Sequence, residues 1–216
     1  RGLGDVYKRQ GQAFKCSCAD VPGNNYFNPT IRSNGSFVKT KGYCTDLFFT
    51  AGLGWINKMK DEENPFFAYI TTNAPHGPFI APPENTKRFT DIGFSEKDAG
   101  FYGMIENIDE NIGILMNKLE EWNLSDDTIL IFMSDNGSVP NIPGAKKYEK
   151  SYNYPLSRGK WDAYEGGVRV PLIISGPGIN NGSESAVPVS GSDILPTILD
   201  LAGNKTVELT KVDGGS

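Results

Sequence analysis

The chain has 216 residues, which is enough for one domain with a sizeable core. Its 21 basic and 26 acidic residues give a formal charge of −5, which argues against broad electrostatic attraction to nucleic acid or anionic lipid. No apolar run approaches the roughly 18 residues of a membrane-spanning helix. The composition therefore predicts a globular protein that captures any anionic ligand through a few local side chains.

The two ends of the sequence differ from its body. Residues 1–10 are unlike the rest of the chain, and we interpret them as a non-native leader. Residues 11–216 then form the domain. The lack of an initiating methionine and the final Asp213, Gly214, Gly215 and Ser216 predict a fragment that is open at both ends.

The cysteines do not identify a redox compartment. Cys16, Cys18 and Cys44 form an odd set without the spacing of a zinc finger. They permit at most one intramolecular disulfide and leave one thiol over.

The first half of the chain predicts one helix and one strand. Residues 11–45 are rich in Gly, Asn, Pro and Ser, which predicts a long irregular connection with short strands. Apolar residues then recur every three to four positions over residues 45–60, as in an amphipathic helix. Residues 66–72 form a β-rich run that predicts a buried strand, and this strand leads into a polar loop at 73–79.

The second half repeats this alternation. Ser95 and Asp98 mark the start of a helix whose apolar face continues to about Trp122. Residues 128–133 predict a second strand that ends in a polar loop, and residues 168–175 predict a third strand. Residues 193–202 predict a closing helix with a proline in its first turn.

Strands that alternate with helices indicate an α/β layer with a largely parallel sheet. Ligands of such sheets usually bind outside the carboxyl ends of the strands. Both polar loops, at 73–79 and at 134–137, are expected at that edge.

Asp135 and Asn136 follow the second strand after Ser134. A carboxylate and an amide carbonyl are hard oxygen ligands that Ca²⁺ or Mg²⁺ prefers. The alternative is that this segment only makes a tight turn, because Asn136 precedes Gly137 and Asn-Gly is a strong turn signal.

Two further side chains, one titratable and one cationic, are candidate functional residues. His76 is the only histidine of the chain and lies in the loop after the first strand. A lone histidine is more often structural than functional. Lys160, beside Gly159, could present its ammonium group to an anion, although an isolated lysine is usually only a solvated charge.

Four blocks in this order resemble successive blocks of the type I sulfatases. They are residues 69–79, residues 134–137, Lys160 with residues 165–171, and residues 193–197. The resemblance covers roughly residues 24–216, and four ordered blocks are much more specific than any one of them.

The resemblance implies an alkaline-phosphatase-like α/β sandwich with a largely parallel central sheet, incomplete at the amino-terminal side. By the same resemblance, Asp135 and Asn136 are ligands of an active-site Ca²⁺. His76 and Lys160 face the sulfate as catalytic and substrate-binding residues. The full-length protein would then hydrolyse sulfate esters of small molecules or carbohydrates, in the periplasm or outside the cell.

The nucleophile of the family is a formylglycine made from Cys or Ser in a Cys/Ser-x-Pro-x-Arg motif. No cysteine of this chain has that context, and the stretch that begins at Ser138 ends in Ile142 where Arg is needed. The tandem Asp ligands of the family are not found either. We therefore expect the nucleophile in a missing upstream segment, and we expect this fragment alone to be inactive.

Two alternatives stay open. A phosphodiesterase or phosphatase of the same superfamily usually needs several histidines for paired Zn²⁺, whereas this chain has only His76. A catalytically inactive scaffold could keep the sulfatase shape. The upstream coding sequence would decide between an enzyme and a scaffold.

Overall fold

The structure is a computed structural model that describes residues 24–62, 65–139, 152–203 and 213–216. Cys16, Cys18, the predicted leader and residues 140–142 lie outside these ranges. The elements in chain order are β1 (Thr30–Ser33), β2 (Ser36–Lys39), α1 (Cys44–Asp61), α2 (Pro83–Asp91), α3 (Glu96–Glu121), a short 3-10 helix η1 (Ser125–Asp127), β3 (Leu130–Met133), α4 (Glu165–Val168), β4 (Leu172–Ser175), a second 3-10 helix η2 (Gly191–Asp193) and α5 (Ile194–Leu201).

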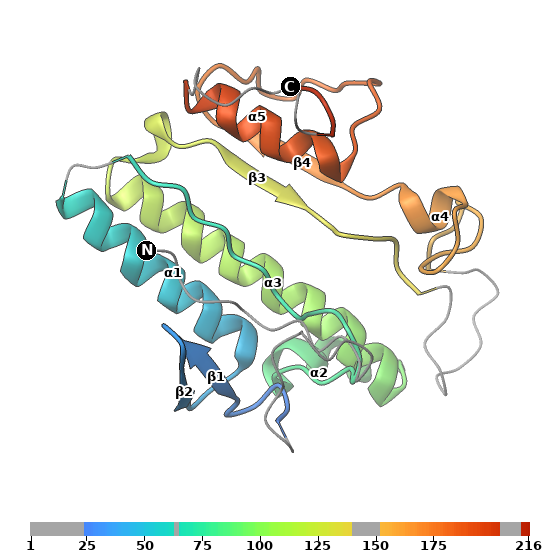
Figure 1. Cartoon of the computed structure of the whole chain (residues 1–216). Coiled ribbons are helices and arrows are strands. Elements are labelled where there is room, and N and C mark those ends of the chain that lie inside the picture. The colour runs from blue at the N-terminus through green and yellow to red at the C-terminus, as the bar shows by residue number, and fades with distance from the viewer. Residues whose placement is uncertain (1–23, 63–64, 140–151, 204–212) are drawn as a thin grey trace.

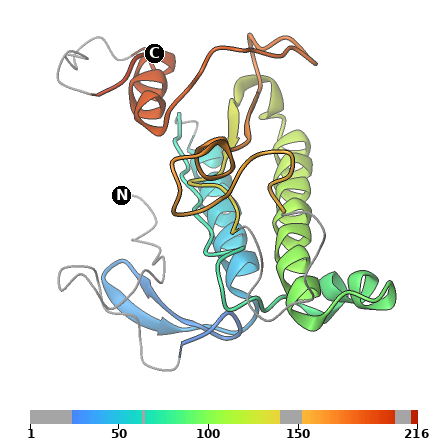
Figure 2. The same cartoon turned by 90° about the vertical axis from the view of Figure 1, so that its right-hand side faces the viewer.

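Helices α1 and α3 lie side by side and form the main helical layer (Figures 1 and 2). Their apolar stripes meet in a buried cluster to which α1 contributes Phe49 and Ile56, and α3 contributes Leu115 and Leu119. The side chain of Ser95 caps α3 by accepting a hydrogen bond from the backbone amide of Asp98. The helices predicted over residues 45–60 and from Ser95 to about Trp122 are confirmed.

A polar network joins the start of α1 to the middle of α3. The side-chain amides of Asn107 and Asn111 each donate to Oδ1 of Asp46 at 2.8 Å. Asn85 of α2 donates to Glu110 of α3 at 2.8 Å. Because hydrogen bonds that reach a carboxylate are stronger than neutral ones, this network fixes how the three helices pack.

Residues 65–73 run extended along the helical layer. Phe66, Ala68 and Ile70 pack against the helices, whereas Phe67 and Tyr69 are 61% and 78% exposed. This period-two alternation is that of a half-buried segment, whereas the sequence predicted a buried strand. The predicted strand itself is not formed, because no backbone ladder joins it to a neighbour in the described part of the chain.

Strands β3 and β4 pair in an antiparallel register, with Leu130 opposite Ser175 and Met133 opposite Leu172. The segment 65–73 and β3 run in the same direction in both views, so their polar loops lie at the same end of the layer (Figures 1 and 2). The sheet is less parallel than predicted among the described strands. In the described residues between β3 and β4, which are 134–139 and 152–171, the single turn of α4 is the only helix, and a parallel neighbour would require a longer crossover.

The remaining elements are peripheral. The hairpin β1–β2 turns at Asn34 and Gly35, whose φ angles of 48° and 89° suit a type I′ turn, and it confirms the short strands predicted before residue 45. Helix α5 lies on the side of β3 and β4 away from α1 and α3, and it confirms the predicted closing helix (Figures 1 and 2). Helix α2 was not predicted. None of the described helices combines the length and the apolar character needed to cross a bilayer.

Candidate active site

The four candidate residues from the sequence line one cavity of about 850 Å³. His76, Asp135 with Asn136, and Lys160 reach it from three separate loops. The wall between them includes apolar and charged side chains from the hairpin, from α3 and from β3. Its members include Tyr26, Arg32, Phe79, Phe132 and Trp161.

His76 lies in a loop that hydrogen bonds fix from both sides. The hydroxyl of Tyr26 donates to the carbonyl oxygen of His76 at 2.7 Å, and the amide of His76 donates to the Asn73 carbonyl at 2.8 Å. Nδ1 of the exposed imidazole lies 2.9 Å from the Gly77 carbonyl. A carbonyl only accepts, so Nδ1 carries a proton and Nε2 is the nitrogen available to a ligand.

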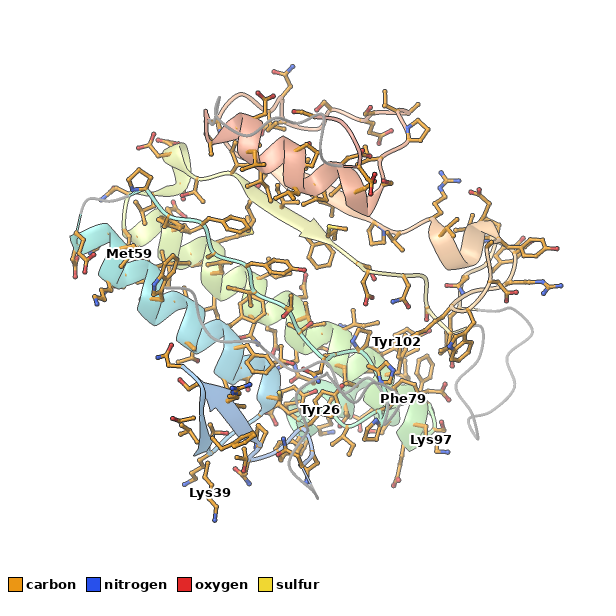
Figure 3. All side chains as sticks on the ribbon, in the orientation of Figure 1. Tyr26, Lys39, Met59, Phe79, Lys97 and Tyr102 are labelled. Carbon is orange, nitrogen blue, oxygen red and sulfur yellow. The ribbon has the colours of Figure 1, made fainter. Side chains whose placement is uncertain are left out.

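Two stacked tyrosines support this loop. The rings of Tyr26 and Tyr43 lie 5.8 Å apart, and both residues are buried. The Tyr43 hydroxyl donates to the Ile80 carbonyl at 2.8 Å, just beyond the His76 loop. Burial, followed by the neighbouring Tyr26, raises the pKa of Tyr43, so its phenol stays a donor. Figure 3 shows Tyr26 and Phe79 at the same end of the molecule, beside the first half of α3.

Asp135 and Asn136 begin the loop after β3. Asp135 is exposed and Asn136 is half-buried, and the Asn136 amide donates to Oδ1 of Asp135. Ser134 Oγ donates to the Asn136 carbonyl at 2.9 Å, which tightens the turn. The structure thus shows a bend at Asp135 and Asn136, and both oxygen-bearing side chains line the cavity.

Asp135 and Asn136 offer oxygen ligands, which are the type that a hard cation prefers, but they are too few to complete its coordination. Ca²⁺ takes 6–8 oxygen ligands, and Asp135 and Asn136 offer a carboxylate and an amide oxygen. Within the described ranges, no three acidic, histidine or cysteine side chains come close enough together to hold a metal. Further ligands would have to come from residues other than these.

Glycines bring two loops into direct backbone contact. They are the loop after β3 at residues 134–139, here called the Asp-Asn loop, and residues 157–167, here called the Lys160 loop. A Cβ atom at Gly137 would overlap the carbonyl oxygen of Gly166. The amide of Gly137 donates to the Gly167 carbonyl at 2.9 Å, and the amide of Lys160 donates to the Ser138 carbonyl at 2.9 Å. The two loops therefore behave as one unit. Cβ atoms at Gly166 and Gly167 would overlap carbonyl oxygens of residues 157–162, so the glycine pair that follows Glu165 lets the Lys160 loop fold closely on itself.

The Lys160 loop is braced by side chains as well. Asn153 donates to the carbonyls of Ser138 and Arg158 at 2.9 Å and 2.8 Å, and Arg158 forms an ion pair with Asp162 at 3.1 Å. Lys160 is half-buried. In the described part of the chain, no carboxylate lies within 4.0 Å of its ammonium group. An uncompensated cation at a cavity wall favours an anionic ligand.

The sequence did not point to Tyr26 or Asn153. Both lie in loops without periodicity, and both act by donating to backbone carbonyls. No sequence pattern marks such a contact, because its partner is main chain that every residue carries.

Comparison with known proteins identifies the family. The Sulfatase family model matches residues 3–204. The uncharacterized sulfatase YdeN of Escherichia coli K12 is 30% identical over 200 residues, covering 90% of this chain and 34% of that protein. The N-acetylgalactosamine-6-sulfatase of Rattus norvegicus is 34% identical over 172 residues, covering 79% of this chain and 31% of that protein. The chain spans about a third of the length of these relatives.

Solved structures agree. The crystal structure of Ps i-CgsB in complex with k-i-k-neocarrahexaose matches with a TM-score of 0.77 and 33% identity, covering 86% of this chain and 40% of that one. The putative sulfatase yidJ from Bacteroides fragilis matches in fold, with a TM-score of 0.69 and 23% identity, over 87% of this chain and 44% of that one. These likenesses confirm the predicted alkaline-phosphatase-like α/β fold. This chain therefore belongs to the sulfatase family.

Proposed function

We propose that the protein to which this chain belongs hydrolyses sulfate esters, and that this chain supplies one wall of its active site. One observation carries the proposal: His76, Asp135, Asn136 and Lys160 come from three loops and line a single cavity in a chain of the sulfatase family. Four polar groups with complementary roles at one pocket are the pattern expected of an active site.

Lys160 and His76 are proposed to act on the sulfate group. The ammonium group of Lys160 neutralises charge on the sulfate oxygens, and the loop contacts fix its position before the reaction begins. Nδ1 of His76 is occupied by the Gly77 carbonyl, so Nε2 faces the substrate. When the ring carries its second proton, Nε2 donates that proton or a hydrogen bond to the leaving oxygen.

Asp135 and Asn136 are proposed as two ligands of a Ca²⁺ ion. When bound, the ion supplies positive charge beside the sulfate. The formylglycine nucleophile and the other metal ligands are expected from the upstream segment. Calcium titration of the full-length protein tests the metal site. Asp135→Ala should weaken binding by tenfold or more, whereas the exposed Asp126→Ala on η1 should not change it.

The proposed substrate is a carbohydrate sulfate ester, met in the periplasm or outside the cell. Three observations support this class. The rat relative is named an N-acetylgalactosamine-6-sulfatase, and Ps i-CgsB was solved with a bound oligosaccharide. The cavity of about 850 Å³ is also large enough for more than a sulfate group.

The deciding experiment assays the full-length, matured protein against matched sulfate and phosphate esters. We expect sulfate turnover that falls about 10²–10³-fold in Lys160→Ala and in His76→Ala. Lys87→Ala is the control, because this lysine is exposed on α2 and pairs with Asp91 outside the cavity. Equal or faster phosphate turnover would favour the phosphatase alternative, and no turnover of either ester would favour the inactive scaffold.

A further inference from the structure

Trp161 stands out by its exposure, although no sequence pattern marks it. It is 83% exposed, more than any other large hydrophobic residue in the described part of the chain. It directly follows Lys160, and both residues line the candidate cavity. A large aromatic side chain at the wall of a cavity offers a flat apolar face and a polar N–H group to a ligand.

The backbone at Trp161 is held in a costly conformation. Its φ angle is 80°, in the left-handed region that bulky residues rarely adopt. The contact from the Asp162 amide to the Gly159 carbonyl, at 3.0 Å, closes a tight turn around Lys160 and Trp161. The ion pair between Arg158 and Asp162 clamps the same turn. Strain that the surroundings maintain is typical of functional sites, and here it presents the indole from a rigid base.

We propose that Trp161 is a specificity-determining residue that stacks against a sugar ring of the substrate. The inference rests on the carbohydrate sulfate proposed above. The face of a pyranose ring carries C–H groups, which suit the electron-rich face of an indole. Lys160 and Trp161 are consecutive, so one loop offers a cation to the sulfate and an aromatic surface to the ring that bears it or to the next ring.

This pairing predicts discrimination between substrates. A sulfated oligosaccharide contacts both Lys160 and Trp161, whereas a short alkyl sulfate has no ring to stack and depends on Lys160. Trp161 therefore contributes to binding of the oligosaccharide and adds nothing for the alkyl ester. A purely structural role of Trp161 would instead change both substrates together, because it would act through the position of Lys160.

The test compares Trp161→Gly with Trp161→Phe in the full-length protein. For Trp161→Gly we expect KM for the sulfated oligosaccharide to rise roughly tenfold, the effect of losing one stacking partner. The turnover of a short alkyl sulfate should stay within about twofold. Trp161→Phe keeps an aromatic face and should retain most of the affinity. Because glycine adopts a positive φ freely, Trp161→Gly should not lower the unfolding temperature.

A second readout does not depend on turnover. Titration with the same oligosaccharide should change the tryptophan fluorescence of the wild-type protein, and the change should survive Trp122→Phe at the end of α3 and disappear in Trp161→Gly. A fluorescence response that persists in Trp161→Gly overturns the proposal. So does an equal loss, or no loss, of both substrates in that variant. Absence of any sulfate turnover would refute the proposed function alone, and the fluorescence titration would still decide on Trp161.

Discussion

Gly137→Ala is the sharpest test of the way in which the Asp-Asn loop meets the Lys160 loop. Besides its overlap with the Gly166 carbonyl oxygen, the added Cβ would lie 2.8 Å from Gly166 C and 2.9 Å from Gly167 Cα. Ordinary contacts between carbon atoms are about 3.5–4.0 Å long. The two loops must therefore move apart by about 0.7 Å or more. The contact is main chain on both sides, so no side-chain rotation can relieve it.

The expected cost has two parts. Overpacking of this kind costs about 1–3 kcal/mol. Separation of the loops also weakens the hydrogen bond from Gly137 to Gly167 and the bond from Lys160 to Ser138, each worth about 1 kcal/mol. We expect the free energy of unfolding to fall by about 2–5 kcal/mol, a large share of the 5–15 kcal/mol that is typical of a domain.

Urea unfolding followed by circular dichroism measures this change, with the slope of the transition as a check on two-state behaviour. Gly113→Ala is the matched control, because it is the same substitution inside α3 with no heavy atom within 4 Å of the added Cβ. It should stabilise the chain by about 0.5–1 kcal/mol. A Gly137→Ala variant that unfolds at the wild-type urea concentration would show that the two loops do not depend on each other.

Three further predictions concern single residues and their contacts. Tyr26→Phe removes the donor to the His76 carbonyl and should lower the free energy of unfolding by about 1 kcal/mol, and it should shift the chain's only imidazole resonances in an NMR spectrum. Met104→Ala empties a fully buried position and should cost about 2–5 kcal/mol in urea unfolding. Hydrogen bonds from backbone amides, first that of Ser190, lower the pKa of Asp193. The ionised Asp193 therefore adds to the free energy of unfolding above its unfolded-state pKa, and this stabilisation is lost as the pH falls below about 4. Asp193→Ala should accordingly flatten the acid side of a plot of the free energy of unfolding against pH.

The helical half of the fold could be predicted from the sequence. The stripes of α1 and α3 have the helical period because each helix buries a single face, and the Ser95 cap leaves a local signal. The candidate site was also predictable in outline. His76 and Asp135 each lie in the loop after an apolar run, and the two extended segments run in the same direction, so both loops lie at one end.

The strand pairing could not be predicted in the same way. Alternation shows which residues face the core, but it does not show which neighbour completes the ladder, because that partner is distant in sequence. Residues 66–72 show the difference: the sequence predicted a buried strand, whereas Phe67 and Tyr69 are exposed and the segment pairs with none of the described strands. The antiparallel partner of β3 depends on the path of the chain after Asp135, which no local pattern encodes.

At the cavity, backbone contacts hold the loops in place, whereas side chains supply the groups that contact a ligand. Main-chain hydrogen bonds and glycine contacts hold the Asp-Asn loop against the Lys160 loop. The His76 loop is held through the backbone carbonyl of His76, which accepts a hydrogen bond from the Tyr26 hydroxyl. The imidazole of His76 and the ammonium group of Lys160 make few of the contacts that hold these loops in place. Substitutions at His76 and Lys160 should therefore affect ligand chemistry with little loss of stability, whereas Gly137 and Gly166, which carry no functional group, set where that chemistry takes place.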